Sequence, residues 1–528
     1  GMNKNKKEIL RKERDKIMKV TYDKLTNLNN NLSNNYITDI DNDNIKHLIE
    51  FSWSHFFSIY CKILTETTND VNSPSYLNNI HSCIENILLI ARTCGILQLG
   101  TEEEAYINAI LNITNLNDNT EINMKSLESI KSFINFIINS GQYVRSGWYN
   151  ILQVISKLEY YLETDMEIIQ EDIKHSISNS NSTNINSKNI NKNIEKEINS
   201  AMQKKEIICN NIPDMVCEGI FSKTDQFDEE TIINFVTNLC IISKQELYDY
   251  HTPRVFCLHK LVEVADFNIF RIQVEWVKIW KLISDHLVEV INKPVHETIW
   301  KEALESLRQT ICKLLQKKDL SIYNFQMDFF KPFEIIFSKT ADFPTRGETI
   351  ISYLYYIVGS FGKNIHSGWI VIFRILKEGF QRKNLKINED IKNTLQKIYE
   401  ENIIINNNAN LEVFRGYIEC LCYMYLNKNN KQFAFETILN LLSKIMINVD
   451  IQNQKDENEN LNDSTNPNNT KIVMKLSNIN KKYDYLKIFF YGFDDLIPVN
   501  VIEHLNLLFE IVSHNKKLKQ INKTMTVL

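Results

Sequence analysis

The scarcity of glycine and proline is the feature that most constrains how this chain can fold. Only 13 Gly and 8 Pro occur in 528 residues, whereas average usage is roughly 7 % Gly and 5 % Pro. Tight β-turns need Gly for positive φ angles and Pro to preset φ. A β-sandwich or β-barrel of this length is therefore disfavoured, and we expect an all-α fold of long helices joined by short connections.

Charge and cysteine usage exclude several classes of partner and cofactor. Lys and Arg number 60 against 65 Asp and Glu, a near-neutral balance that gives no general attraction to nucleic acid, so no nucleic-acid partner is expected. No apolar run reaches the roughly 18 residues that cross a bilayer. The ten cysteines contain no C-x-x-C pair, which disfavours zinc modules and disulfide frameworks. We expect a cytoplasmic protein with reduced cysteines and no cofactor or metal.

Apolar residues recur at helical spacing in nearly every non-polar stretch. Between 269 and 290, apolar side chains that include Ile269, Ile272 and Trp276 lie three or four residues apart, which predicts one face of a long helix. The same reading predicts helices over 45–64, 78–98, 101–114, 122–139, 148–163, 228–243, 254–267, 299–317, 349–360, 367–380, 386–402, 410–426, 431–447 and 499–514.

Two tracts rich in Asn and Ser interrupt this pattern, over 176–205 and 450–470. Such composition buries too little apolar surface to offset the entropy of ordering the backbone, so both tracts are predicted to be disordered surface insertions. They divide the chain into helical repeat blocks over 1–175, 206–449 and 471–528.

A short motif that occurs twice in the sequence indicates internal repeats. Ser146-Gly147-Trp148 and Ser367-Gly368-Trp369 are followed by apolar residues at the same spacing. We expect Gly to end one helix in the left-handed conformation, Ser to cap the next helix, and Trp to anchor its first turn. Helix pairs that recur in this way stack into an α-solenoid, here of HEAT/armadillo-like repeats.

Each partial match to a known catalytic motif lacks a residue or a spacing that the motif requires. Gly359 to Asn364 has the wrong spacing for a phosphate loop, and the segment from His296 to Trp300 has Trp where a zincin helix needs its second His. Asp285 and His286 are adjacent on a predicted helix and point about 100° apart, so a polar helix end is favoured over an acid–base pair. No catalytic, cofactor-binding or metal-binding residue is predicted.

An ordered block of residues forms a distinctive pattern. Its members are Pro253, Arg254, Asn268, Arg271, Trp276, Trp280, Asp285, His286, Ser306, Arg308, Gln309, Phe325, Phe329, Pro332, Phe333, Ser367, Gly368 and Trp369. The block begins with the pattern P-R-x-F-x-L-x-K-[IL]-V-E-[IV]. It resembles one family, the large brefeldin A-inhibited guanine-nucleotide exchange factors for Arf GTPases, in the region that follows the exchange domain, where the family's own pattern ends in I-R-S-G-W. The likeness is strongest over 253–376 and weak beyond 385.

The resemblance implies the repeats called homology downstream of Sec-seven, which fall within the 206–449 block. In this family the region binds activated Arf-family and Rab-family small GTPases at the trans-Golgi, lies peripheral to the membrane through its partners, and adjusts autoinhibition of its own exchange domain. Exchange itself depends on a Glu finger in an L-P-G-E-A motif. Because no L-P-G occurs in this chain, we expect a regulatory and targeting region of vesicular transport that is not itself an enzyme.

Two alternatives stay open. The chain is either part of an exchange factor or a stand-alone Golgi trafficking scaffold of the related family without an exchange domain. The motif residues are either partner contacts or structural. We favour solenoid core for Trp148, Trp276, Trp280 and Trp369, and polar ties between repeats for Arg254, Arg308 and Asp285.

Overall fold

A computed structural model describes most of the chain up to residue 438. The described residues are 12, 14, 16–24, 42–65, 74–116, 121–180, 187–213, 216–293, 296–316, 326–340, 343–382, 384–401, 411–426, 430–434 and 436–438. All regular structure in these ranges is helical, and they contain no strand. The predicted all-α class is confirmed.

The chain divides into two compact units, and the first spans residues 1–115, 122–136 and 143–147. It contains α2 (Asn42–Thr65), α3 (Pro74–Ile96), α4 (Gly100–Ile113) and most of α5 (Met124–Ser140). Helices α2, α3 and α4 pack against one another. Their contact is centred on side chains such as Ile84, Tyr106 and Ile107, all of which are fully buried.

The second unit spans 116–121, 137–142 and 148–528. After the short η1 (Gly141–Tyr143), its elements are α6 (Trp148–Glu163), α7 (Met166–Ser180), α8 (Ser187–Asn211), α9 (Glu218–Ser222), η2 (Lys223–Gln226), α10 (Glu229–Tyr248), α11 (Phe256–Phe267), α12 (Gln273–Asn292), α13 (Glu297–Gln316), α14 (Gln326–Lys339), α15 (Pro344–Phe361), η5 (Gly362–Asn364), α16 (Gly368–Gln381), α17 (Leu385–Glu400) and α19 (Leu411–Leu426).

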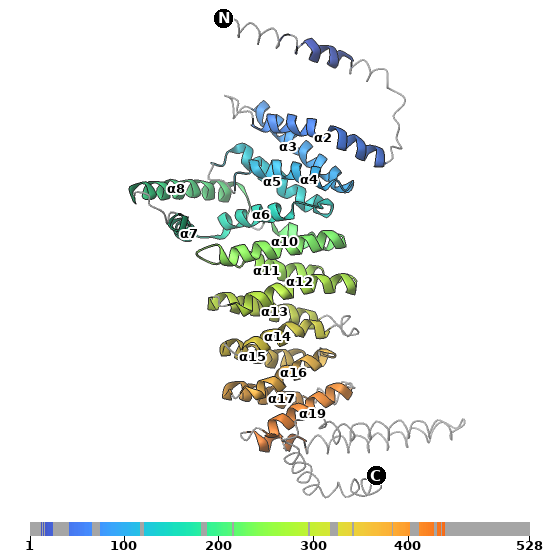
Figure 1. Cartoon of the computed structure of the whole chain (residues 1–528), viewed down its shortest axis with the longest axis vertical. Coiled ribbons are helices and arrows are strands. Elements are labelled where there is room, and N and C mark those ends of the chain that lie inside the picture. The colour runs from blue at the N-terminus through green and yellow to red at the C-terminus, as the bar shows by residue number, and fades with distance from the viewer. Residues whose placement is uncertain are drawn as a thin grey trace, which may run out of the picture. The chain divides into compact units, whose positions relative to one another are not determined.

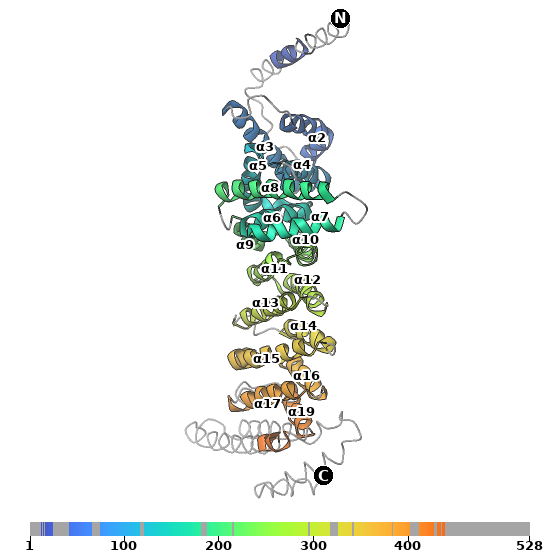
Figure 2. The same ribbon diagram turned by 90° about the vertical axis from the view of Figure 1, so that its left-hand side faces the viewer.

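Helices of the second unit stack in two layers. One layer runs α10, α12, α14, α16, α19 and the other α11, α13, α15, α17, each helix packing on the next of its own layer; Figures 1 and 2 show both layers. Polar ties join residues about one repeat apart: Asn268 to Thr224, Trp280 to Asp328, and Arg382 to Thr340. These separations of 44, 48 and 42 residues compare with about 40–47 for HEAT and armadillo repeats. The predicted solenoid is confirmed, and the repeat type stays a prediction.

The apolar face predicted between 269 and 290 is largely confirmed. Trp276, Ile279 and Ile283 on α12 are each no more than 2 % exposed. Ile272 is different, because α12 begins only at Gln273, and Ile272 stands at the N-cap with 66 % of its surface exposed. The helix therefore begins four residues later than the spacing predicted.

The two Ser-Gly-Trp copies agree in Trp and differ in Ser and Gly. Trp148 and Trp369 are both buried, as expected. Gly147 has φ +80° and confirms the left-handed prediction, whereas Gly368 is simply the first residue of α16. The predicted Ser caps are wrong: Ser146 Oγ donates to Gly100 O (2.8 Å), and Ser367 makes no side-chain cap bond.

The first Asn-rich tract departs from its predicted disorder. Residues 187–205 belong to α8, which packs against α6 and α7. Ala201 and Ile208 of this helix are buried, and Lys205 Nζ donates to Tyr161 O at 2.7 Å. A narrow apolar stripe is therefore enough to dock a helix that is polar elsewhere. Residues 181–186, the 450–470 tract, the 471–528 block and the helix predicted over 499–514 lie outside the described residues, and the block boundaries stay predictions.

Candidate partner-binding site

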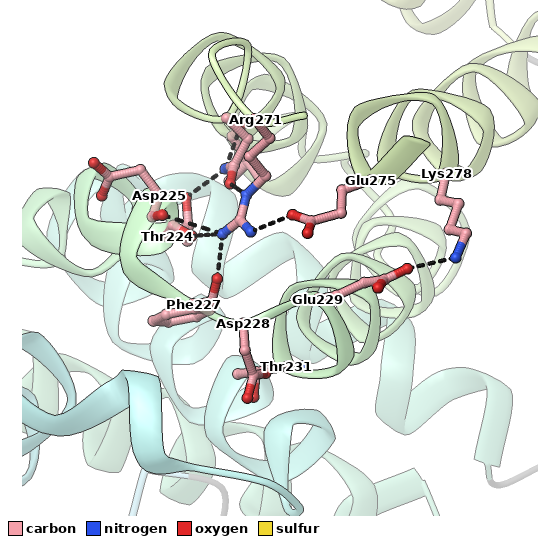
Figure 3. Close-up of polar contacts among 11 residues, drawn as sticks. Thr224, Asp225, Phe227, Asp228, Glu229, Thr231, Arg271, Glu275 and Lys278 are labelled. Carbon is pink, nitrogen blue, oxygen red and sulfur yellow. Dashed lines mark hydrogen bonds and ion pairs between the residues drawn. The ribbon is translucent and has the colours of Figure 1, made fainter. Parts of the chain in front are cut away.

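Arg271 fixes the turn between α11 and α12 (Figure 3). Its guanidinium donates to the backbone carbonyl oxygens of Thr224 (2.9 Å), Asp225 (3.2 Å) and Phe227, which belong to the preceding helical connection. It also pairs with Glu275 at 3.1 Å. Since the guanidinium fork meets several acceptors at once, the turn is held in one position against the previous repeat.

Asn268 also holds this turn in place, through hydrogen bonds of its buried side chain. Its Nδ2 donates to Thr224 Oγ1 (2.9 Å) and to Val264 O (2.8 Å), while its Oδ1 accepts from Arg271 Nε (2.6 Å). The Asn268 side chain is fully buried. Both Asn268 and Arg271 therefore act as ties between repeats.

The fixed turn presents a row of exposed apolar side chains, which we call the α11–α12 ridge: Phe267 (40 % exposed), Phe270 (77 %), Ile272 (66 %) and Val274 (66 %). Single exposed apolar residues are ordinary, but a concentration of large ones on a rigid turn marks a candidate interaction surface. The helical spacing predicts that Ile272 lies on the buried face, and no sequence pattern assigns a role to the other three residues. The four residues are spaced three, two and two positions apart, which fits no single face of a helix. This irregular spacing of apolar residues is the sequence signal from which the ridge could have been predicted.

Arg254 is a tie between elements, as favoured from the sequence. Its Nη1 donates to Ser156 O (3.3 Å) and pairs with Glu246 Oε1 (3.2 Å), a carboxylate whose side chain is 1 % exposed. It thereby links α6 to α10. The neighbouring Pro253 is exposed.

Trp276 and Trp280 lie in the core between repeats. Their rings stack with centroids 5.6 Å apart, and Phe329 of α14 meets Trp276 edge-on at 5.1 Å. Trp280 Nε1 donates to Asp328 O at 3.0 Å. Pro332 and Phe333 of α14 are buried as well, while Phe325 lies outside the described residues.

Asp285 and His286 do not act together. His286 is 4 % exposed and its Nε2 lies 3.0 Å from Ser243 Oγ, and burial lowers the pKa of His286 to about 4. Asp285 is exposed. The two side chains therefore face apart, as their adjacency on one helix predicts. Asp285 forms no hydrogen bond or ion pair with any described residue, so the polar tie between repeats that the sequence favours is not found at Asp285.

Arg308 and its neighbours form a group on α13. Arg308 Nε donates to Glu305 Oε2 at 2.8 Å, and Gln309 Nε2 donates to Glu305 Oε1 at 3.0 Å. The pairing raises the pKa of Arg308. The ion pair thus joins two residues of the same helix. A cation–π contact links Arg308 to the next repeat, because its guanidinium lies 5.0 Å from the centroid of the Tyr356 ring. Ser306 of the same helix is buried.

At the start of α16, Gly368 allows a close approach. A Cβ at this position would lie 2.6 Å from a ring carbon of Phe330. Trp369 stacks on Phe373 with centroids 5.4 Å apart. Gly368 therefore serves the packing of α16 on α14, whereas the Trp369 stack lies within α16.

Within the described part of the chain, no three or more His, Cys, Asp or Glu side chains converge as a metal site would require. None of its helices combines the length and the apolar character needed to traverse a bilayer.

Comparison with known proteins places this architecture in a class. The family model described as Mon2/Sec7/BIG1-like, HDS matches residues 313–397. The chain is 23 % identical over 437 residues to brefeldin A-inhibited guanine nucleotide-exchange protein 1 of Arabidopsis thaliana, covering 76 % of this chain and 25 % of that protein. The rat protein of the same name is 26 % identical over 349 residues, covering 63 % and 18 %.

A third relative is the ADP-ribosylation factor guanine nucleotide-exchange factor sec72 of Schizosaccharomyces pombe, 22 % identical over 438 residues, covering 79 % of this chain and 24 % of that protein. This chain is thus a helical-repeat region related to the Arf guanine nucleotide-exchange factors. The resemblance to the brefeldin A-inhibited type that the motif block indicated is confirmed. The chain spans a quarter or less of the length of these relatives.

Proposed function

We propose that this chain is a non-catalytic regulatory and targeting region of an Arf exchange factor, and that it binds GTP-loaded Arf-type GTPases through the α11–α12 ridge. Its relatives are named as guanine nucleotide-exchange proteins, one of them for ADP-ribosylation factor. The observation that carries the proposal is the ridge itself, an exposed apolar row on a turn that Asn268 and Arg271 hold rigid.

Rigidity supports a binding role because a preformed surface loses little conformational freedom on association. The guanidinium of Arg271 is satisfied by carbonyl oxygens and Glu275, so the frame does not need a partner to become ordered. Apolar side chains that are already fixed can form the desolvated centre of an interface, with the surrounding charged pairs as its rim.

Dependence on GTP is expected from the partner. The switch segments of small GTPases are ordered by contacts with the γ-phosphate and its Mg²⁺ and are released on hydrolysis. A rigid apolar ridge binds an ordered surface more tightly than a disordered one, because a disordered segment loses conformational entropy when it becomes ordered on binding. We therefore expect the GTP-loaded form to bind more tightly than the GDP-loaded form.

A pull-down with the purified chain tests the proposal. GTP-loaded Arf is expected to be retained and GDP-loaded Arf to be lost, with a panel of Rab-type GTPases as the second arm. Equal retention of both nucleotide forms, or retention of neither, would overturn it.

Rab binding, control of autoinhibition of an exchange domain and recruitment to the trans-Golgi are further parts of the proposal. Imaging of the tagged chain in cells with and without active Arf tests the last part.

A nucleotide-release assay tests the non-catalytic part. The purified chain is expected to leave the rate of nucleotide release from Arf unchanged, and acceleration would contradict this. The stand-alone scaffold alternative differs in one observation: the full gene product would contain no L-P-G-E-A exchange domain.

A further inference from the structure

The exposed side of α2, in the first unit, is apolar over most of its length. Its large apolar side chains, which we call the α2 stripe, are Leu48 (66 % exposed), Phe51 (82 %), Phe56 (50 %), Ile59 (56 %) and Ile63 (37 %). The opposite side of α2 packs on α3 and α4 (Figure 1), where Phe57 meets Tyr106 edge-on with ring centroids 5.4 Å apart. The stripe therefore faces away from the core of the first unit.

An apolar surface on both sides of one helix indicates that both sides are covered. A helix that is apolar all round is normally buried all round. Ser52 lies among the residues of the stripe, but its hydroxyl donates to Leu48 O at 2.7 Å within the helix itself. Single exposed apolar residues are ordinary, whereas five on one side of one helix mark an interaction surface.

The length of the stripe decides between two partners. The stripe spans residues 48–63, which is 16 residues or about 24 Å along the helix axis. The exposed N-terminal helix over residues 16–24 carries Ile17 and Val20, but its nine residues extend over only about 14 Å. A second copy of α2 presents a stripe of the same length and therefore matches the whole surface.

The charges of α2 favour an antiparallel arrangement of two copies. The N-terminal half of the helix carries Asp43 and Glu50 against Lys46, and the C-terminal half carries Lys62 and no acid. Antiparallel pairing brings the acidic half of each copy to the basic half of the other, with Glu50 opposite Lys62, and charges that flank an apolar seam set the orientation of paired helices. The helix dipoles also oppose each other favourably in this arrangement.

We propose that two copies of this chain associate through the α2 stripe, antiparallel, about a two-fold axis next to His55. A two-fold interface uses the same patch on both copies, so one self-complementary stripe is sufficient. The exposed parts of its five side chains amount to about 450 Å² per copy and about 900 Å² in the pair. This area is at the lower end for specific interfaces, so the dimer is weak and reversible.

Sedimentation equilibrium of the whole chain tests the association. One chain has a mass of 62.1 kDa. We expect the mean mass to rise toward twice this value with increasing concentration, with a dissociation constant on the order of 10 µM. The mass of one chain at every concentration up to about 200 µM would overturn the proposal, and this measurement requires no variant.

Phe51→Asp tests the assigned surface, because it places a carboxylate at the centre of a desolvated apolar contact. We expect the dissociation constant to rise at least tenfold. Leu385→Asp, 71 % exposed on α17 of the second unit, is the matched control and should leave the dimer unchanged. A dimer that Phe51→Asp does not weaken would contradict the α2 stripe.

Cysteine cross-linking tests the antiparallel arrangement. Under mild oxidation His55→Cys should form a disulfide between two copies, identified as a peptide joined to itself at residue 55. Asp43→Cys should form none at residue 43, because these positions lie at opposite ends of an antiparallel pair. The reverse pattern would overturn the arrangement. A chain that dimerises only after removal of residues 1–24 would assign the stripe to those residues and exclude the second copy.

Discussion

Glu103, in the first unit, is a buried carboxylate that makes stability depend on pH. It is 1 % exposed and accepts from the backbone N–H of Arg145 at 2.9 Å. Burial raises the pKa of Glu103 from 4.5 to about 7, although hydrogen bonds at Arg145 and Ser146 partly oppose this. In the unfolded chain the group ionises near its ordinary pKa, so the folded state binds more protons between these two values.

The contribution of Glu103 is therefore fully present below pH 4.5 and is lost as pH rises through about 7. At about 1.4 kcal/mol per pKa unit, the change is at most about 3.5 kcal/mol. Glu103→Gln, which keeps an acceptor oxygen for Arg145, should unfold at a temperature that varies less between pH 5 and 8 than that of the unmodified chain. Parallel profiles for the two proteins would show that Glu103 does not titrate in this range.

Arg271 is expected to be sensitive even to a conservative change. Lysine in its place keeps the charge near Glu275 but cannot meet the carbonyls of Thr224 and Phe227 together. We expect Arg271→Lys to lower the free energy of unfolding by about 2 kcal/mol, measured by urea denaturation. Lys278→Met is the matched control, since the Lys278–Glu229 pair is about half exposed and should contribute less than about 1 kcal/mol. Equal losses in both variants would contradict the role of the guanidinium fork.

Between elements, the packing of α14 on α16 depends on the absence of a side chain at position 368. In Gly368→Ala the new methyl group would meet the Phe330 ring at 2.6 Å, and overpacking of this kind costs about 1–3 kcal/mol. Gly100, at the start of α4, has only Ser146 within 4 Å, so Gly100→Ala should be neutral or stabilising by up to about 1 kcal/mol. Thermal unfolding of the two variants checks this contrast, and a Gly368→Ala protein as stable as Gly100→Ala would contradict it.

Helices with a broad apolar face could be predicted from the sequence. The range 148–163 predicted for α6 is the observed one, because its buried face recurs along the whole helix. Helix α14 was not predicted, since Pro332 interrupts a pattern that packing against α16 nevertheless stabilises. The composition of helix α8 predicts disorder because its many polar residues conceal the apolar stripe that includes Ala201 and Ile208.

The site was less predictable than the fold. The motif residues Asn268 and Arg271 were recognised, but their role as ties depends on Thr224 and Phe227, which lie 44 residues away. Contacts one repeat apart cannot be read from local spacing. The ridge could not be predicted for a related reason: Ile272 has the spacing of a core residue but is exposed because α12 begins only after it, at Gln273.

At the scale of the whole molecule, the second unit is a solenoid in which each repeat packs mainly on its neighbours. Such proteins are stabilised by local interfaces between repeats. The motif residues mostly form those interfaces, and this arrangement leaves the exposed turns free for recognition. The Arf-related function is thus expected to depend on surface residues that the motif positions but does not itself include.

The most direct test measures the affinity of the chain for GTP-loaded Arf with Ile272 and Val274 both changed to Asp. These positions are the N-cap and first turn of α12, where Asp favours the helix, so folding should be preserved. Leu385→Asp, in the first turn of α17 and 71 % exposed, is the matched control. We predict at least a tenfold loss of affinity in the ridge variant and none in the control. Unchanged affinity in the ridge variant would contradict the claim that the α11–α12 ridge is the binding surface.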